Sequence, residues 1–167
     1  MHRLTEEDYR GFSEAIRKRK RGPILVNMAD RLIVVLTMVA YPMLLCYCYF
    51  YERGILPRTI LVPAFSFAAV SIFRHFYDRK RPYELMDFDP VIKRDGQGHS
   101  MPSRHVFSIF MIAMCFFQVD VSLGFTFCIM GFALAFIRVY GGVHYPSDVL
   151  AGAVAAICMG AFGFWVF

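Results

Sequence analysis

Two histidines and one aspartate have the residue types and spacing of an acid–base site. Asp148 follows His144 by four positions in the stretch HYPSD. A carboxylate there could accept one imidazole N–H and leave the other ring nitrogen with a free lone pair, as in a catalytic triad. His105 has no acid at a comparable spacing, so it is better suited to protonating a leaving oxygen. The pattern predicts His144 as nucleophile or base, Asp148 as its orienting partner and His105 as acid.

Four arginines lie in three polar segments around these residues. Arg74 and Arg81 belong to RHFYDRKRP, Arg104 to SMPSRH and Arg138 to RVYGGVHYPSD. Guanidinium groups stay charged and form bidentate hydrogen bonds with phosphate oxygens. A cluster of them repels itself unless a multiply charged anion lies between them. Phosphate is the anion that this set of residues fits best.

The segment SMPSRH indicates the start of a helix that offers an anion site. Ser100 or Met101 can cap such a helix, and Pro102 suits its first turn, where a missing N–H costs nothing. The next backbone amides would point outward at the positive end of the helix dipole, which favours bound anions. These amides belong to Ser103, Arg104 and His105.

The elements that position these residues are blocks of apolar sequence. Hydrophobic residues make up 57% of the chain and charged residues 19%. Leu32–Tyr51 is an uncharged run of twenty residues. Such a run is enough to cross a hydrocarbon core of about 30 Å. The shortest block, Val106–Val119, could be a re-entrant or buried helix unless its helix starts at Ser103. The sequence predicts an all-α integral membrane protein with about five transmembrane helices, the remaining spans being Gly54–Phe73, Val121–Ile137 and Val149–Phe167.

Residues 1–23 are predicted to form a basic N-terminal surface helix ahead of a membrane domain at 24–167. Thr5 is a candidate N-cap, with acids in the first turn and a basic run at the end. Tyr9, Phe12 and Ile16 share one side, so this helix could lie along the membrane surface. The alternative is a solvated basic tail that only sets the topology.

Because successive spans alternate in direction, the N-terminus and the segments 74–104 and 138–148 should share one side of the membrane. Every Lys and Arg except Arg53 and Arg58 falls on that side. Cytoplasmic loops carry an excess of Lys and Arg. We therefore expect the N-terminus and the candidate site to face the cytoplasm of a bacterial plasma membrane.

A metal site is the main alternative for the histidines. Candidate ligands are present, but no pair has a recognised metal-site pattern on a regular helix, because Pro146 interrupts HYPSD. The sequence therefore predicts no metal and no cofactor. The ligand types in question belong to Asp95, His99, His105, His144 and Asp148.

The three polar segments resemble the signature of the type 2 phosphatidic acid phosphatase superfamily of membrane lipid phosphatases, which shares its core with vanadium haloperoxidases. That signature is Lys, six residues, Arg-Pro; then Pro-Ser-Gly-His; then Ser-Arg, five residues, His, three residues, Asp. The matching positions in this chain are Arg74 and Arg81-Pro82, then Pro102-Ser103-Arg104-His105, then Arg138, His144 and Asp148.

Three positions depart from that signature, and so does the number of spans. Arg74 replaces a lysine and keeps its charge, whereas Arg104 replaces a glycine and brings a bulky side chain to the site. Ile137 replaces a serine and loses a hydroxyl. The commoner members have six spans, and the five spans predicted here would correspond to the last five of them.

The resemblance implies a metal-free, two-step phosphatase. His144, oriented by Asp148, would attack phosphorus, His105 would protonate the departing group, and water would release phosphate. The phosphate oxygens would be held by Arg74, Arg81, Ser103, the backbone amide of Arg104, and Arg138. The implied substrate is a lipid phosphate in the bilayer, of the phosphatidylglycerophosphate or phosphatidate type. The alternatives are a polyprenyl (undecaprenyl) diphosphate phosphatase and a non-catalytic protein that binds anionic lipid. No nucleic-acid partner is expected.

Overall fold

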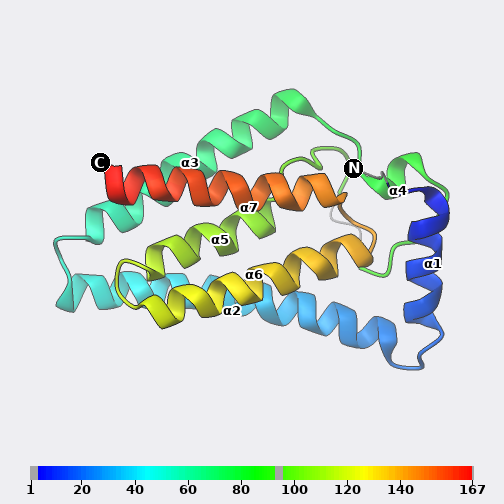
Figure 1. Cartoon of the computed structure of the whole chain (residues 1–167), viewed down its shortest axis with the longest axis horizontal. Coiled ribbons are helices and arrows are strands. Elements are labelled where there is room, and N and C mark those ends of the chain that lie inside the picture. Colours follow the sequence, from blue (N-terminus) through cyan, green and yellow to red (C-terminus); the bar gives the residue numbers. More distant parts are fainter. Residues whose placement is uncertain (1–3, 93–95, 167) are drawn as a thin grey trace.

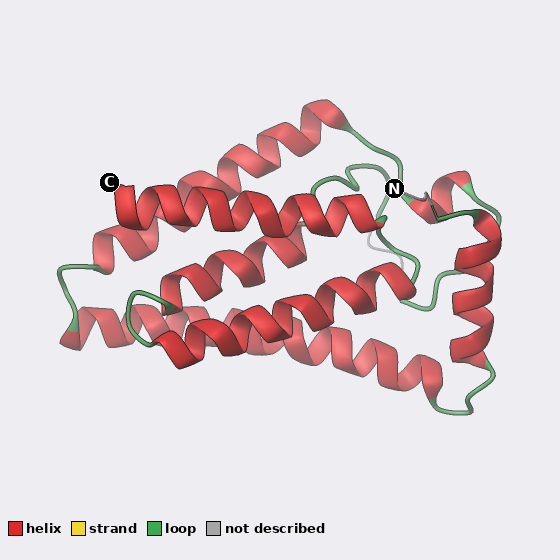
Figure 2. Cartoon of the chain, viewed as in Figure 1, coloured by secondary structure: helices red, strands yellow, loops and turns green. Residues whose placement is uncertain are grey.

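The computed structural model describes residues 4–92 and 96–166, and all regular structure within these ranges is helical (Figure 2). Four helical stretches in the described part of the chain are long and apolar enough to cross a membrane: Gly22–Tyr51, Leu56–Leu85, Val121–Tyr140 and Pro146–Val166. They contain the helices α2 (Gly22–Tyr51), α3 (Leu56–Tyr77), α6 (Val121–Tyr140) and α7 (Pro146–Ala161), the last extended by the π-helical turn Phe162–Val166. The predicted all-helical membrane fold is confirmed.

The fifth principal helix of this part of the chain, α5 (Arg104–Phe116), is short and lies inside the bundle. An α-helix of this length rises only about 20 Å. That rise is less than a hydrocarbon core of about 30 Å. Most side chains of α5 are buried, among them Phe107, Ile109 and Phe110. The helix starts at Arg104, one residue after the predicted Ser103, which is its N-cap, and it ends at Phe116. Four of the five predicted spans are therefore long enough to cross a membrane, and α5 fits the alternative of a buried helix.

Glycines on the two helices beside α5 allow close packing against it. A Cβ on Gly131 of α6 would lie 2.8 Å from the Phe110 ring, and one on Gly160 of α7 would lie 2.8 Å from Met114. No hydrophobic driving force holds helices together inside a membrane, so they associate through close packing, which small residues allow. The position of α5 is thus set by α6 and α7.

All three polar segments lie at one end of the bundle, as predicted (Figure 1). They occupy the end of α3, the start of α5 and the return between α6 and α7, beside the short helix α4 (Pro82–Leu85). The turns joining α2 to α3 and α5 to α6 lie at the opposite end.

Helix α1 (Glu6–Arg17) crosses the end of the bundle that holds the three polar segments, here called the functional end (Figure 1). Thr5 caps it as predicted, through a reciprocal capping box with Asp8. The apolar side of α1 has a protein partner, because Tyr9 is fully buried and its ring stacks on Phe88 at 5.2 Å. A salt bridge of 2.6 Å joins Arg17 to Asp89. The next helix, α2, begins at Gly22, close to the predicted boundary at 24.

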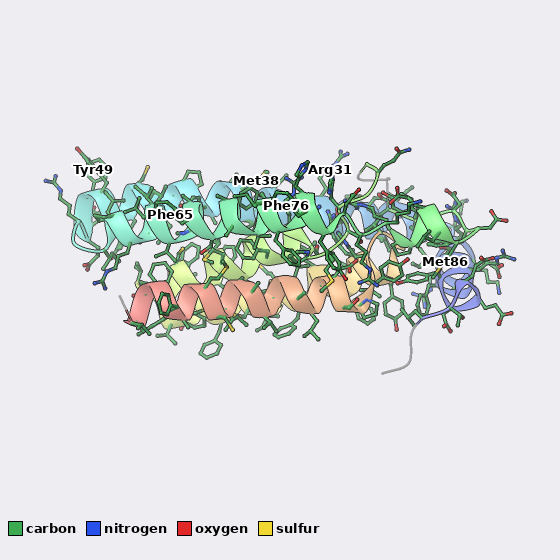
Figure 3. The ribbon with its side chains drawn as sticks, turned by 90° about the horizontal axis from the view of Figure 1, so that it is seen from above. Arg31, Met38, Tyr49, Phe65, Phe76 and Met86 are labelled. Carbon is green, nitrogen blue, oxygen red and sulfur yellow. The ribbon has the colours of Figure 1, made fainter. Side chains whose placement is uncertain are left out.

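Large apolar side chains cover the outside of α2 and α3. Figure 3 shows Met38, Phe65 and Phe76 on this side of the bundle, and each is at least 70% exposed. Exposed apolar surface of this kind is expected where lipid, and not water, surrounds a helix.

Candidate active site

His144, Asp148 and Ser100 form a buried hydrogen-bonded cluster. His144 Nδ1 lies 3.4 Å from Asp148 Oδ2 and 3.3 Å from Ser100 Oγ. The Ser100 hydroxyl donates to Asp148 Oδ2 at 2.5 Å, so its oxygen is available to accept from the Nδ1–H of His144. This arrangement turns Nε2 of His144 away from the carboxylate, with its lone pair available. The predicted pairing of His144 with Asp148 is present in the structure.

Ser100 is a member of this cluster that sequence reasoning missed. It was expected to cap α5, but the cap residue is Ser103, and Ser100 contacts Asp148 from 48 positions away. The residue before a proline is disfavoured in helical conformation, which delays the start of α5 until after Pro102. Pro102 accordingly precedes the helix and does not lie in its first turn.

Asp148 receives two further donors that fix its carboxylate. The backbone N–H of Tyr145 donates to Oδ2 at 3.0 Å, and Arg79 Nη1 donates to Oδ1 at 2.7 Å. Arg79 also donates to Ser147 Oγ at 2.7 Å and lies over the Tyr145 ring at 4.2 Å. Arg79 is therefore engaged with the carboxylate that pairs with His144.

The electrostatic surroundings of His144 keep its imidazole neutral. Burial lowers the pKa of His144 to about 4, against the opposing effect of the hydrogen bond to Asp148. The positive charges of Arg81 and Arg138 also lower this pKa. A neutral imidazole has the lone pair that nucleophilic attack requires, so His144 at neutral pH has the protonation state that the predicted role needs.

Three of the predicted phosphate-binding arginines line one cavity. Arg74, Arg81 and Arg104 contribute to a cavity of about 230 Å³, together with Ser71, His75, Gln97, Gly98 and His99. Arg74 Nη1 donates to the carbonyl of Pro102, and Arg81 Nε donates to the carbonyl of Gly98 at 3.2 Å. These bonds to backbone oxygens hold two buried guanidinium groups in place. The cavity offers a concentration of positive charge that suits phosphate.

The start of α5 differs in one respect from the anion site expected there. The backbone N–H of Ser103 already donates to the carbonyl of Asp148 at 2.9 Å, so it is not a free amide. The Ser103 hydroxyl, in contrast, is fully buried and has no hydrogen-bond partner among the described residues. A buried hydroxyl without a partner costs free energy unless a ligand satisfies it. The side chain of Ser103 is therefore the group available to an anion.

Arg138 does not line that cavity and has an acidic partner. Its Nε and Nη2 atoms donate to Asp30 Oδ1 at 2.9 Å and Asp30 Oδ2 at 3.0 Å, a bidentate pair. The Arg138 carbonyl accepts from the N–H groups of Val143 and His144, which places it directly beside the candidate nucleophile. Asp30 was not singled out in the sequence, although it is an acid at the edge of an apolar run.

His105 lines a different cavity, which extends into the membrane part of the bundle. This cavity of about 470 Å³ lies between α2, α3, α5 and α6 and also includes Arg104. A second cavity of about 450 Å³ shares Tyr41, Phe67 and Ser108 with it. Together they form an apolar groove, and Arg104 lines both this groove and the arginine-lined cavity described above. The structure thus separates His105 from the arginine cavity and joins the two through Arg104.

Tyr9 connects the N-terminal helix to the site, which the sequence did not indicate. Its hydroxyl donates to the backbone carbonyl of His144 at 3.2 Å, across 135 positions. Burial raises the pKa of Tyr9, so the hydroxyl keeps its proton and remains a donor. The amphipathic pattern of α1 contained the only signal, since it marked Tyr9 as a residue of the apolar side.

The candidate metal ligands that the structure describes form no set of three. Within residues 4–92 and 96–166, no group of three or more His, Cys, Asp or Glu residues is arranged to hold a metal ion. Asp95, one of the ligand types considered, lies outside the described residues. His99 contacts the end of α3 instead, with Nδ1 at 2.9 Å from the Arg74 carbonyl.

Residues 56–167 match the family model described as the PAP2 superfamily. This segment is more than half of the chain and contains every predicted catalytic and phosphate-binding residue. The chain therefore belongs to the PAP2 superfamily.

Three curated proteins are similar in sequence. The chain is 36% identical over 67 residues to the bacitracin transport permease protein BcrC of Bacillus licheniformis and 35% identical over 77 residues to the lipid A 4'-phosphatase of Bacteroides thetaiotaomicron. These matches cover 40% and 44% of the chain but only 33% and 32% of the relatives. Similarity to the undecaprenyl-diphosphatase BcrC of Bacillus subtilis is 24% identity over 141 residues, covering 80% of the chain and 72% of the relative.

Two crystal structures share the fold. The Aquifex aeolicus protein LpxE superposes with a TM-score of 0.70 at 22% identity, over 83% of this chain and 85% of that one. A transmembrane PAP2-type phosphatidylglycerolphosphate phosphatase from Bacillus subtilis gives a TM-score of 0.72 at 18% identity, over 95% of this chain and 83% of that one.

Proposed function

We propose that the chain is a metal-independent phosphatase that removes phosphate from a lipid phosphate through a phosphohistidine intermediate. One observation carries the proposal: the arginine-lined cavity and the apolar groove share Arg104. A molecule with a phosphate at one end and a hydrocarbon chain at the other matches both. The relatives named as phosphatases of lipid A and of undecaprenyl diphosphate support the same class of substrate.

In the first step, Nε2 of His144 attacks phosphorus, the bond from phosphorus to the lipid oxygen breaks, and that oxygen takes a proton from His105. Asp148 and Ser100 hold the Nδ1–H, so the imidazole keeps its orientation while it gains positive charge. The leaving lipid would lie in the groove that His105 lines, which supports His105 as the proton donor.

In the second step, water gives a proton to His105 and attacks phosphorus, and the bond from phosphorus to nitrogen breaks. This releases inorganic phosphate and restores both histidines. Donors aimed at the oxygens where charge develops account for much of the acceleration in such transfers. The donors proposed here are the side chains of Arg74, Arg81, Ser103, Arg104 and Arg138.

Phosphate release by the detergent-purified protein tests this function. The panel is phosphatidate, phosphatidylglycerophosphate and undecaprenyl diphosphate, each with EDTA present and with His144→Ala as the inactive control. We expect release that survives EDTA and is lost in the variant. Release that requires one added metal would contradict the mechanism, and a cellular role unaffected by His144→Ala would favour non-catalytic lipid binding.

The groove has its own test within the same assay. Ser108→Trp would fill the space shared by the two apolar cavities, which Ser108 lines in both. We expect it to raise the KM for a long-chain lipid phosphate, while hydrolysis of the water-soluble p-nitrophenyl phosphate stays unchanged. Equal effects on both substrates would contradict a chain-binding role for the groove.

A polyprenyl diphosphate is the second candidate substrate. Beside Arg74 and Arg81, the cavity is lined by Arg104 and by His75 and His99, which could contact a second phosphate. The similarity to an undecaprenyl-diphosphatase over 80% of the chain favours this candidate. Release from the diphosphate and not from the two monophosphates in the panel would establish it.

We also propose that the site faces the cytoplasm, because the basic residues concentrate at this end of the bundle. Engineered cysteines at Glu52 and Lys20 test it, since both positions are exposed and flank α2 at its two ends. In intact cells, a membrane-impermeant thiol reagent should label position 52. Labelling at position 20 instead would reverse the orientation.

A further inference from the structure

The carboxylate of Asp30 lies in α2, outside all three polar segments that carry the candidate site. Within α2, which the structure describes throughout, Asp30 is the single acidic side chain among thirty residues. A carboxylate this close to the hydrocarbon region is costly unless it is paired, and such residues generally serve a function. Asp30 is paired with Arg138, and their side chains are only 13% and 3% exposed.

The geometry of this pair fixes the guanidinium of Arg138 in direction as well as in place. Two parallel N–H···O bonds, of 2.9 and 3.0 Å, join the Nε/Nη2 edge to both carboxylate oxygens. A planar fork held at two points cannot rotate about its axis, which a single hydrogen bond would allow. The backbone of Arg138 is fixed in addition, because its carbonyl accepts from the N–H groups of Val143 and His144.

Charge supplies a second reason for an acid at this point. Arg81 and Arg138 both act electrostatically on His144, and Arg74 and Arg104 line the neighbouring cavity. Without a bound anion, such a group of like charges is repulsive. Asp30 offsets the charge of Arg138, one of the two arginines that act on His144, so the site can assemble before phosphate arrives.

We propose that Asp30 is a positioning residue for the reaction: it orients Arg138 for the phosphoryl group that His144 receives. This inference rests on the proposed function, since it gives Arg138 a phosphate to hold. Asp30 itself does not touch the substrate. Loss of Asp30 should weaken stabilisation of the transition state more than substrate binding. A misplaced Arg138 loses most of its interaction with the negative charge that develops on the phosphoryl oxygens.

The first test is Asp30→Asn, which keeps the shape of the side chain and removes its charge and one acceptor. We expect kcat to fall roughly tenfold to a hundredfold with little change in KM, as misplacement of a catalytic group does. Inhibition by orthovanadate, which mimics the phosphoryl group in transfer, should weaken in parallel. Asp30→Glu, which restores the charge on a longer side chain, should recover part of the loss.

Asn27 provides a matched control for the alternative that Asp30 only stabilises the packing of α2 against the bundle. Asn27 lies one turn earlier on α2, and its Nδ2 donates to the carbonyl of Val91 at 2.8 Å without contacting Arg138. Asn27→Ala should lower the unfolding temperature and keep kcat and vanadate sensitivity. A loss of kcat in Asn27→Ala equal to that in Asp30→Asn would overturn the proposal.

A double variant separates action through Arg138 from any other effect. In an Arg138→Gln background, Asp30→Asn should cause no further loss of kcat, because the residue it positions is gone. An undiminished loss in that background, or wild-type kcat in Asp30→Asn alone, would contradict the role of Asp30. A wild-type protein that released no phosphate from any lipid would contradict the proposed function instead, so the two failures are distinguishable.

Discussion

Replacing Gly152 by alanine tests whether the contact between α7 and the start of α5 sets the geometry of the site. A Cβ at this position would lie 2.7 Å from the carbonyl oxygen of Ser103 and 3.3 Å from the backbone nitrogen of Phe107. Real Cβ atoms essentially never approach within 3.0 Å, and backbone atoms cannot rotate away as side chains do. Because packed interiors leave no free space to absorb the methyl group, Gly152→Ala must push the two helices apart at this contact.

That displacement falls on the bonds that assemble the candidate site. The Ser103 N–H donates to the Asp148 carbonyl at 2.9 Å, and the Ser100 hydroxyl donates to the Asp148 carboxylate at 2.5 Å. We expect the free energy of unfolding to fall by about 1–3 kcal/mol, as for other overpacked cores. Because small displacements of catalytic groups reduce rates steeply, kcat/KM should fall roughly tenfold or more.

Gly160→Ala is the control, since it adds the same methyl group to the same helix. Its Cβ would lie 2.8 Å from the Met114 side chain, two turns farther from the site. Thermal unfolding in detergent and phosphate release should be measured for both variants. We expect similar losses of stability and a loss of kcat/KM in Gly152→Ala alone. Wild-type kcat/KM in Gly152→Ala, or equal losses in the two variants, would refute the reasoning.

Three further predictions concern the residues around His144. Ser100→Ala removes the donor to a buried carboxylate. Such a bond contributes about 1.5–3 kcal/mol, so kcat/KM should fall by roughly tenfold to a hundredfold in the phosphate-release assay. Tyr9→Phe removes the donor to the His144 carbonyl. It should cost about 1 kcal/mol in detergent unfolding and lower kcat less than Ser100→Ala does. The pKa of His144 falls from 6.5 in the unfolded chain to about 4 in the folded one. The unfolded state therefore binds more protons between these values, so stability should be full above the unfolded pKa and decline as the pH falls toward the folded one. The decline should amount to at most about 3 kcal/mol and be absent in His144→Gln.

The sequence predicted the parts of the site whose geometry is local. Four positions in one stretch brought His144 to Asp148, and the alternation of apolar blocks brought three distant polar segments to one end of the bundle. Both inferences follow from helix periodicity and membrane crossing, which are properties of short windows. Val106–Val119 was counted among the five predicted spans, with a buried helix as the alternative, and its length alone did not decide between the two.

The partners that hold the site in place could not be predicted in that way. Asp30 reaches Arg138 across 108 positions, Ser100 reaches Asp148 across 48, and Tyr9 reaches His144 across 135. No spacing rule applies over such separations, because the contacts depend on how the helices pack. The prediction that the Ser103 backbone amide is free was wrong for the same reason, because this N–H donates to the carbonyl of Asp148 in α7.

The enclosed position of α5 has a consequence for how the protein responds to bilayers of different thickness. Hydrophobic mismatch changes the tilt of helices that lipid surrounds, and here these are α2, α3, α6 and α7. At the functional end, Arg138 ties α2 to α6 through Asp30, and Arg74 ties α3 to the Pro102 carbonyl ahead of α5. The turns joining α2 to α3 and α5 to α6 lie at the other end. A thicker or thinner membrane should therefore move the helices apart at that end, while the spacing of the arginines around the candidate site stays the same.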